Sequence, residues 1–176
     1  MKQFSQMRKI TYTSLFIALG LILPFLTGQV PQIGNMLCPM HIPVLLCGFV
    51  CGWSWGLLAG VVVPLLRSFL FSMPVLFPSA VCMAFELGTY GMVAGLLHKK
   101  LPQKPWNVYV SLFSAMIIGR IVWGVAMSIC MGFTGQAFGM AAFLAGAVTN
   151  AVPGILVQIV LIPVIVSTLE KEKRRT

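Results

Sequence analysis

Long runs of apolar residues, separated by short polar or proline- and glycine-containing breaks, dominate the sequence. A membrane-spanning helix needs roughly 20 predominantly apolar residues, so these runs predict six transmembrane helices. The expected spans are 10–27, 37–52, 55–71, 77–98, 108–131 and 138–169. The second span is short for a full crossing, and we expect a tilted or partly buried helix there. The sixth span is expected to be interrupted by Pro153 and Pro163.

Composition supports an integral membrane protein. The 176 residues are 59% hydrophobic and 9% charged, whereas a soluble domain carries about 25% charged residues. Most of the basic residues behind the net charge of +9 flank apolar runs, so they indicate orientation in the membrane and not nucleic-acid binding. We therefore expect an all-α integral membrane protein with a single membrane domain over residues 1–176 and no cleaved signal peptide.

Lysine and arginine gather in three clusters, within 2–9, 99–104 and 171–175. Cytoplasmic segments are enriched in these residues, so all three clusters are expected on the cytoplasmic side. Four expected spans separate the first two clusters and two separate the last two, whereas a five-span chain would place one cluster outside. The six-helix bundle is thus predicted to have both termini in the cytoplasm. Its outer loops would lie near 29–34, 72–76 and 132–139.

Three charged side chains, Arg67, Glu86 and Arg120, are isolated inside the apolar runs. Ionised groups are costly near the bilayer centre and usually face a protein interior or a polar cavity. From the helical rise, Glu86, Arg120 and Asn150 lie about 13 to 17 Å below the outer ends of their spans, and Arg67 lies about 6 Å below. These four side chains from four spans are expected to line a substrate pocket that opens to the outside.

Each of the four also has a purely structural interpretation. Glu86 and Arg120 can form a salt bridge between two helices. Arg67 can extend to the outer lipid headgroups, and Asn150 can make an interhelical hydrogen bond. Because Glu86 neutralises only one arginine, a spare positive charge would remain. It would suit a carboxylate or phosphate, which a guanidinium binds through paired hydrogen bonds.

Further candidates for the pocket are His41, as a rim residue or a helix cap, and three aromatic residues able to stack on a ring, Phe77, Tyr90 and Trp123. Cys38 lies three residues before His41, but without an acidic cluster or a second Cys-His pair we expect no metal site. The sequence has no P-loop and no H-E-x-x-H motif. We expect no cofactor, no catalytic residue and no enzyme activity, so the energy for any uphill transport would come from a partner.

Small residues recur at a spacing of four, which lets helix backbones approach closely. Close packing within the bundle is expected for Gly91 and Gly95 and for a series that continues across the predicted turn between the second and third spans, namely Gly48, Gly52, Gly56 and Gly60. Ser14 and Ala18 form a similar pair on the first span. Because this span is the first of the bundle, its partner at that face could be another protein.

Three segments resemble the substrate-binding S components of energy-coupling-factor (ECF) vitamin transporters: 40–49 (MHIPVLLCGF), 56–68 (GLLAGVVVPLLRS) and 85–91 (FELGTYG). The resemblance covers most of the chain. It implies a small protein of a prokaryotic plasma membrane that captures a vitamin from outside and docks on a transmembrane T component driven by two cytoplasmic ATPases. The docking motif of the family, A-x-x-x-A on the first helix, corresponds here to Ser14 and Ala18, with serine in place of the first alanine.

The spare positive charge favours an anionic vitamin, and pantothenate suits a compact pocket with two arginines. Folate, a pyridoxine-type vitamer and a cobalamin-type ligand stay open. Two other functions also stay open. A membrane scaffold of the cell-shape type needs no buried arginines beside an outer pocket. A stand-alone secondary transporter usually has inverted repeats and several intramembrane acids, whereas this sequence has no clear repeat and one such acid, Glu86.

The topology can be tested by cysteine labelling in intact cells, in a background whose native cysteines have been replaced. A cysteine at Leu101, in the basic loop, should not react with a membrane-impermeant maleimide, because that loop is predicted to be cytoplasmic. A cysteine at Gly132 should react readily. Labelling of position 101 from outside would rule out the six-span arrangement.

Overall fold

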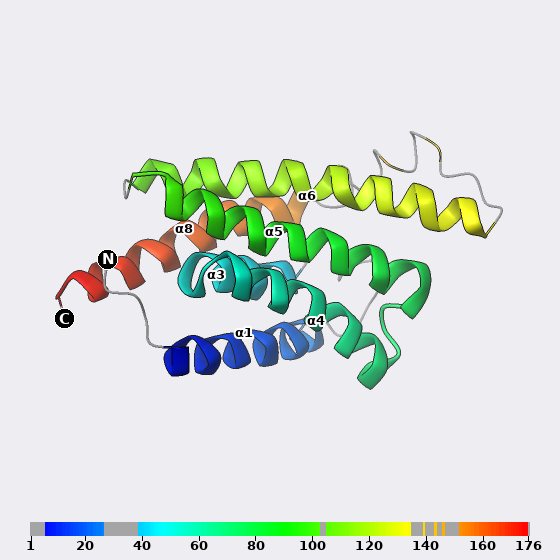
Figure 1. The fold of residues 1–176 in the computed structure, drawn as a ribbon, viewed down its shortest axis with the longest axis horizontal. Coiled ribbons are helices and arrows are strands. Elements are labelled where there is room, and N and C mark those ends of the chain that lie inside the picture. Colours follow the sequence, from blue (N-terminus) through cyan, green and yellow to red (C-terminus); the bar gives the residue numbers. More distant parts are fainter. Residues whose placement is uncertain are drawn as a thin grey trace.

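The computed structural model describes residues 6–26, 39–102, 105–134 and 152–175, together with Gly139, Phe143 and Gly146. All regular elements in these residues are helical. They are α1 (Gln6–Leu26), α3 (His41–Cys51), α4 (Trp53–Phe71), η1 (Leu76–Ala80), α5 (Val81–Lys100), α6 (Pro105–Phe133) and α8 (Val152–Arg175). The start of α1, the end of α5 and the end of α8 lie at the same end of the bundle (Figure 1). This arrangement agrees with the prediction that the three basic clusters lie on one side of a membrane. That this side is the cytoplasmic one stays a prediction.

Among the described residues, five helices are long and apolar enough to cross a membrane, whereas α3 is shorter. With 11 residues, α3 is about 16 Å long, roughly half the thickness of the hydrocarbon core. Nine of its residues are buried, and it packs against α1, α4, α5 and α8. The expectation of a short, partly buried second helix is confirmed, and its described part begins at His41. The count of six full crossings is not established, because α3 does not match the bilayer thickness.

The last helix differs most from the sequence-based expectation. α8 begins at Val152, so Pro153 lies in its first turn, where proline is tolerated because the N–H groups there have no partner within the helix. The helix then continues through Pro163 to Arg175. The predicted interruption at Pro163 is therefore wrong: in membrane helices, neighbouring groups and local adjustments compensate for the hydrogen bond that proline removes. Residues 27–38, with the predicted outer loop at 29–34, lie outside the described part.

Glycines bring the backbones of α3, α4 and α5 into direct contact. A Cβ atom at Gly48 or Gly56 would collide with the backbone of Gly91, and one at Gly60 would collide with the Leu87 carbonyl. A Cβ atom at Gly95 would lie 2.5 Å from the Trp53 nitrogen. These contacts confirm the close packing predicted from the glycine spacing. They also fix the distance between α4 and α5, the helix that carries Glu86.

Gly52 has a different role from the other glycines of its series. Its φ of 101° and ψ of 172° belong to a region that essentially only glycine adopts, and a Cβ atom there would meet nothing within 4 Å. Its N–H donates to the Gly48 carbonyl at 3.1 Å, and its carbonyl accepts from the Gly56 N–H at 2.9 Å. Gly52 is therefore at the turn between α3 and α4, where the sequence predicted a turn, and it makes no close packing contact of its own.

The glycine contacts can be tested by comparing Gly91→Ala with Gly132→Ala. The first should lower the free energy of unfolding by about 1–3 kcal/mol, because the new methyl group meets backbone atoms that cannot rotate away. The second adds a methyl group to open space in α6 and should leave stability unchanged or slightly higher. Thermal unfolding of the purified proteins in detergent measures both. An equal effect of the two substitutions on thermal unfolding would contradict the close backbone contact at Gly91.

Candidate functional site

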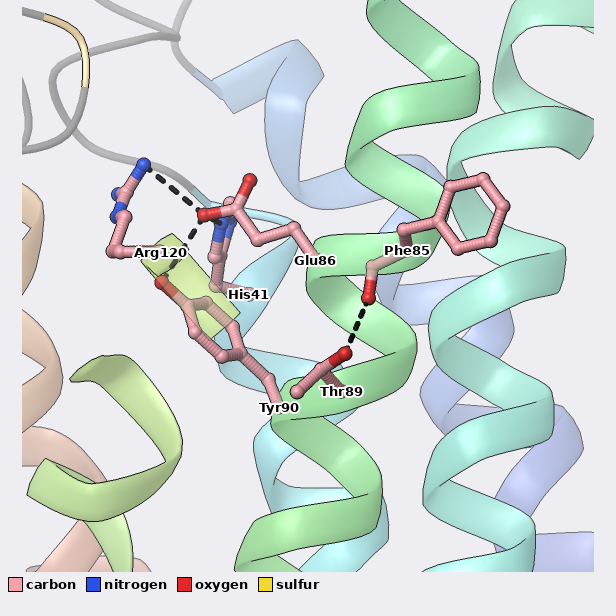
Figure 2. A network of polar contacts seen from close by, with 6 residues as sticks. All are labelled: His41, Phe85, Glu86, Thr89, Tyr90 and Arg120. Carbon is pink, nitrogen blue, oxygen red and sulfur yellow. Dashed lines mark hydrogen bonds and ion pairs between the residues drawn. The ribbon is translucent and has the colours of Figure 1, made fainter. Parts of the chain in front are cut away.

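A buried polar cluster lies where α3, α5 and α6 meet. Glu86 and Tyr90 stand one turn apart on α5, so both point to the same side of that helix. His41 is the first residue of α3, and Arg120 comes from α6. Figure 2 shows these four side chains converging on one another. The Thr89 hydroxyl, in contrast, donates to the Phe85 carbonyl at 2.7 Å within α5 and takes no part in the cluster.

The Glu86 carboxylate is the centre of the cluster, and its residue is only 2% exposed. Its Oε1 atom lies 3.0 Å from Arg120 NH1 and 3.5 Å from His41 Nε2. The Tyr90 hydroxyl donates to the same oxygen at 3.1 Å. A buried carboxylate is tolerated only when opposite charge and hydrogen bonds replace its hydration. Three elements of the bundle supply this replacement here.

The buried polar atoms without a hydrogen-bond partner among the described residues include the Nδ1 atom of His41 and the Oε1 atom of Gln158 on α8. Their residues are 2% and 1% exposed. Such groups are costly unless water or a ligand satisfies them. Sequence reasoning missed Gln158. A polar side chain within the most apolar candidate span, Val152–Leu169, is the signal that would have found it.

The Tyr90 ring of α5 packs against α6 and against His41. The Tyr90 ring lies against Gly119, where a Cβ atom would collide with the ring, and its centroid lies 5.2 Å from that of His41. Gly119 thus leaves room for the ring beside Arg120. Trp123, one turn further along α6, is stacked on Phe143 with centroids 6.3 Å apart. Tyr90 therefore joins the cluster that sequence analysis proposed, whereas the contacts shown for Trp123 are with the segment before α8.

Arg67 is buried in a different place. Its NH1 group donates to the Leu21 carbonyl of α1 at 2.8 Å. Its guanidinium carbon lies 5.1 Å from the Phe25 ring centroid and 5.5 Å from that of Phe71. None of these contacts joins it to the Glu86 cluster. The sequence-based estimate concerned depth along the helix axis, and it carried no information on the direction in which the α4 side chain points.

The remaining candidates are placed as follows. Ser14 and Ala18 are exposed on α1, as a face available to a partner helix requires. Asn150 and Cys38 lie outside the described residues. Within the described part of the chain, no group of three or more histidine, cysteine or acidic side chains is arranged to hold a metal ion.

Chemically, the cluster offers hydrogen-bond donors and acceptors around one neutralised ion pair. Glu86 and Arg120 are the only charged residues contributed by α5 and α6 at this depth, and they contact each other. The described arrangement contains no second carboxylate beside Glu86. Binding of a polar small molecule fits this chemistry better than its transformation does.

Comparison with curated proteins and with solved structures finds no match to this chain. A family model, described as ECF transporter, substrate-specific component, matches residues 8–166. The match includes most of the chain and all of α3, α4, α5 and α6. The resemblance inferred from the three sequence segments is confirmed, and the chain belongs to the family of substrate-specific components of ECF transporters.

Proposed function

We propose that this chain is the high-affinity substrate-binding subunit of an ECF-type importer in the plasma membrane of a prokaryote. It captures a vitamin or related micronutrient from the outer side and delivers it together with a T component and two ATPase subunits. The observation that carries this proposal is the buried cluster of Glu86, Arg120, His41 and Tyr90 in a chain of this family. A ligand entering between α3, α5 and α6 would meet all four.

Family membership favours this function over the two alternatives drawn from the sequence. A cell-shape scaffold has no need of a buried ion pair with further polar groups around it. A stand-alone secondary transporter would couple transport to an ion through intramembrane acids, and Glu86 is the one such acid in the apolar spans. Its carboxylate is already held by an arginine and a tyrosine.

The structure changes the basis of the anionic substrate proposed from the sequence. Arg67 contacts α1, so Arg120 and His41 are the groups that would hold a carboxylate such as that of pantothenate. A ligand carboxylate at Arg120 would share that guanidinium with Glu86.

Pantothenate and pantothenol provide a direct test, because pantothenol replaces the carboxylate with a hydroxyl. We expect pantothenate to stabilise the purified protein against heat, since a ligand of the folded state shifts unfolding by mass action. Arg120→Ala should weaken binding by about 30- to 3,000-fold, because a charge-assisted contact in a dry site contributes about 2–5 kcal/mol. Isothermal titration calorimetry measures each affinity.

A neutral version of the ion pair is the matched control for this experiment. The double variant Glu86→Gln/Arg120→Gln removes both charges and leaves no buried charge unpaired. It should fold and yet lose pantothenate binding. Normal affinity in the double variant would show that the pair is structural. Equal binding of pantothenol by the wild-type protein would show that the site does not recognise a carboxylate.

Docking on the T component is the second testable part of the proposal. Ala18→Trp should hold two helix backbones apart, because small-x-x-x-small contacts depend on close approach. We expect uptake in cells that contain the T component and ATPases to fall sharply, with ligand affinity unchanged. Leu19→Trp is the control, because Leu19 is also exposed but lies about 100° around α1. Loss of binding with intact association in Ala18→Trp would contradict the docking role.

A further inference from the structure

Arg67 is the most deeply buried cation among the described side chains, and its residue is 4% exposed. It belongs to α4, yet two of its three contacts are with α1: the Leu21 carbonyl and the Phe25 ring. Phe71, the last residue of α4, provides the third. The Phe25 and Phe71 rings meet edge to face, with centroids 4.8 Å apart. The guanidinium therefore joins the later turns of α1 to the later turns of α4.

These contacts account for the charge of Arg67 without a ligand. A guanidinium over two aromatic rings gains cation–π attraction, which is stronger away from water. Its hydrogen bond to a backbone carbonyl near the C-terminal end of α1 also places it where the helix dipole favours a cation. Such an arrangement is expensive to build in an apolar layer. Ordinary apolar packing would hold the two helices together at lower cost. What the directional contacts of Arg67 add is a defined position of α1 on α4.

Much of the rest of α1 faces away from the bundle. It is the least buried of the five candidate spans, and it packs mainly on α3 and α4. In the first half of α1, the Thr13 hydroxyl accepts a hydrogen bond from the Cys47 thiol at 3.7 Å, a weak contact. In the middle, a Cβ atom at Gly20 would lie 2.9 Å from Val63, so the two helices are close there. The hydrogen bond from Arg67 to the Leu21 carbonyl adds a charge-assisted contact between α4 and α1.

We propose that Arg67 is a positioning residue for α1: it fixes how this helix lies on α4, and thereby how the exposed Ser14 and Ala18 are presented to the T component. This proposal rests on the proposed docking role of that face. It assigns Arg67 to coupling with the transporter, and no longer to substrate binding as the sequence predicted. Ligand-site residues on α5 and α6 are not affected by it, because their cluster does not include Arg67.

The experiment combines two measurements on Arg67→Met, which keeps an unbranched apolar side chain and removes the charge. Hydrogen–deuterium exchange in detergent should rise in α1 and stay at wild-type levels in α5 and α6. Recovery of the co-expressed T component and ATPases on the tagged chain should fall at least tenfold. Arg67→Lys retains a cation near the two rings. It should restore part of the protection of α1 from exchange and part of the recovery of the T component and ATPases. Leu70→Met, at an exposed position on the same helix, should behave as wild type.

Each other outcome has a defined meaning. If the wild-type chain recovers no T component, the proposed function fails, whatever Arg67 does. If the wild type recovers it and Arg67→Met recovers as much, the positioning role alone is wrong. Exchange that rises in every helix would show a general structural role. The variant Phe25→Leu, which removes one ring from the guanidinium and keeps the hydrogen bond to the Leu21 carbonyl, then decides. Wild-type exchange in α1 and wild-type recovery in that variant would overturn the proposal.

Discussion

A single carboxylate in an apolar layer determines much of the arrangement of this protein. Glu86 cannot stay ionised at its depth unless other groups replace its water. Arg120, Tyr90 and His41 do so from α6, α5 and the start of α3. Because each contact acts over about 3 Å, the three helices must meet at that level of the bundle. Removing one member would leave the remaining buried polar groups without their partners. The bundle would then be less stable, so the fold depends on the same residues as the site.

The glycine contacts make that meeting possible. α4 and α5 touch through their backbones at Gly56, Gly60 and Gly91, so α5 lies close to the interior and Glu86 is directed away from lipid. Gly119 lets α6 pack closely against α5, because it leaves room for the Tyr90 ring. Small residues therefore determine the distances between helices, and the polar cluster determines which faces of the helices are turned toward one another.

Much of this could be predicted from the sequence, and the failures share a physical cause. Apolar runs predicted the long helices because length and hydropathy are local properties. Glycine spacing predicted close packing because a repeat of small residues can also be recognised locally in the sequence. The direction of a side chain around the helix axis could not be predicted, because it depends on which neighbour each face meets. Arg67 and Glu86 are both buried charges, yet one faces α1 and the other faces α3 and α6. Gln158 was overlooked because a neutral amide disturbs the hydropathy of its span far less than a charge does.

The short, buried α3 has a consequence for how the chain enters the membrane during synthesis. An 11-residue helix is too short to be held across a bilayer by its own contact with lipid. Most of its surface is covered by protein, so its place depends on helices that surround it. The Gly52 turn joins it directly to α4, a helix long enough to span. α3 and α4 are therefore suited to insert together as a hairpin, and His41 reaches its place beside Glu86 only after α5 has been added.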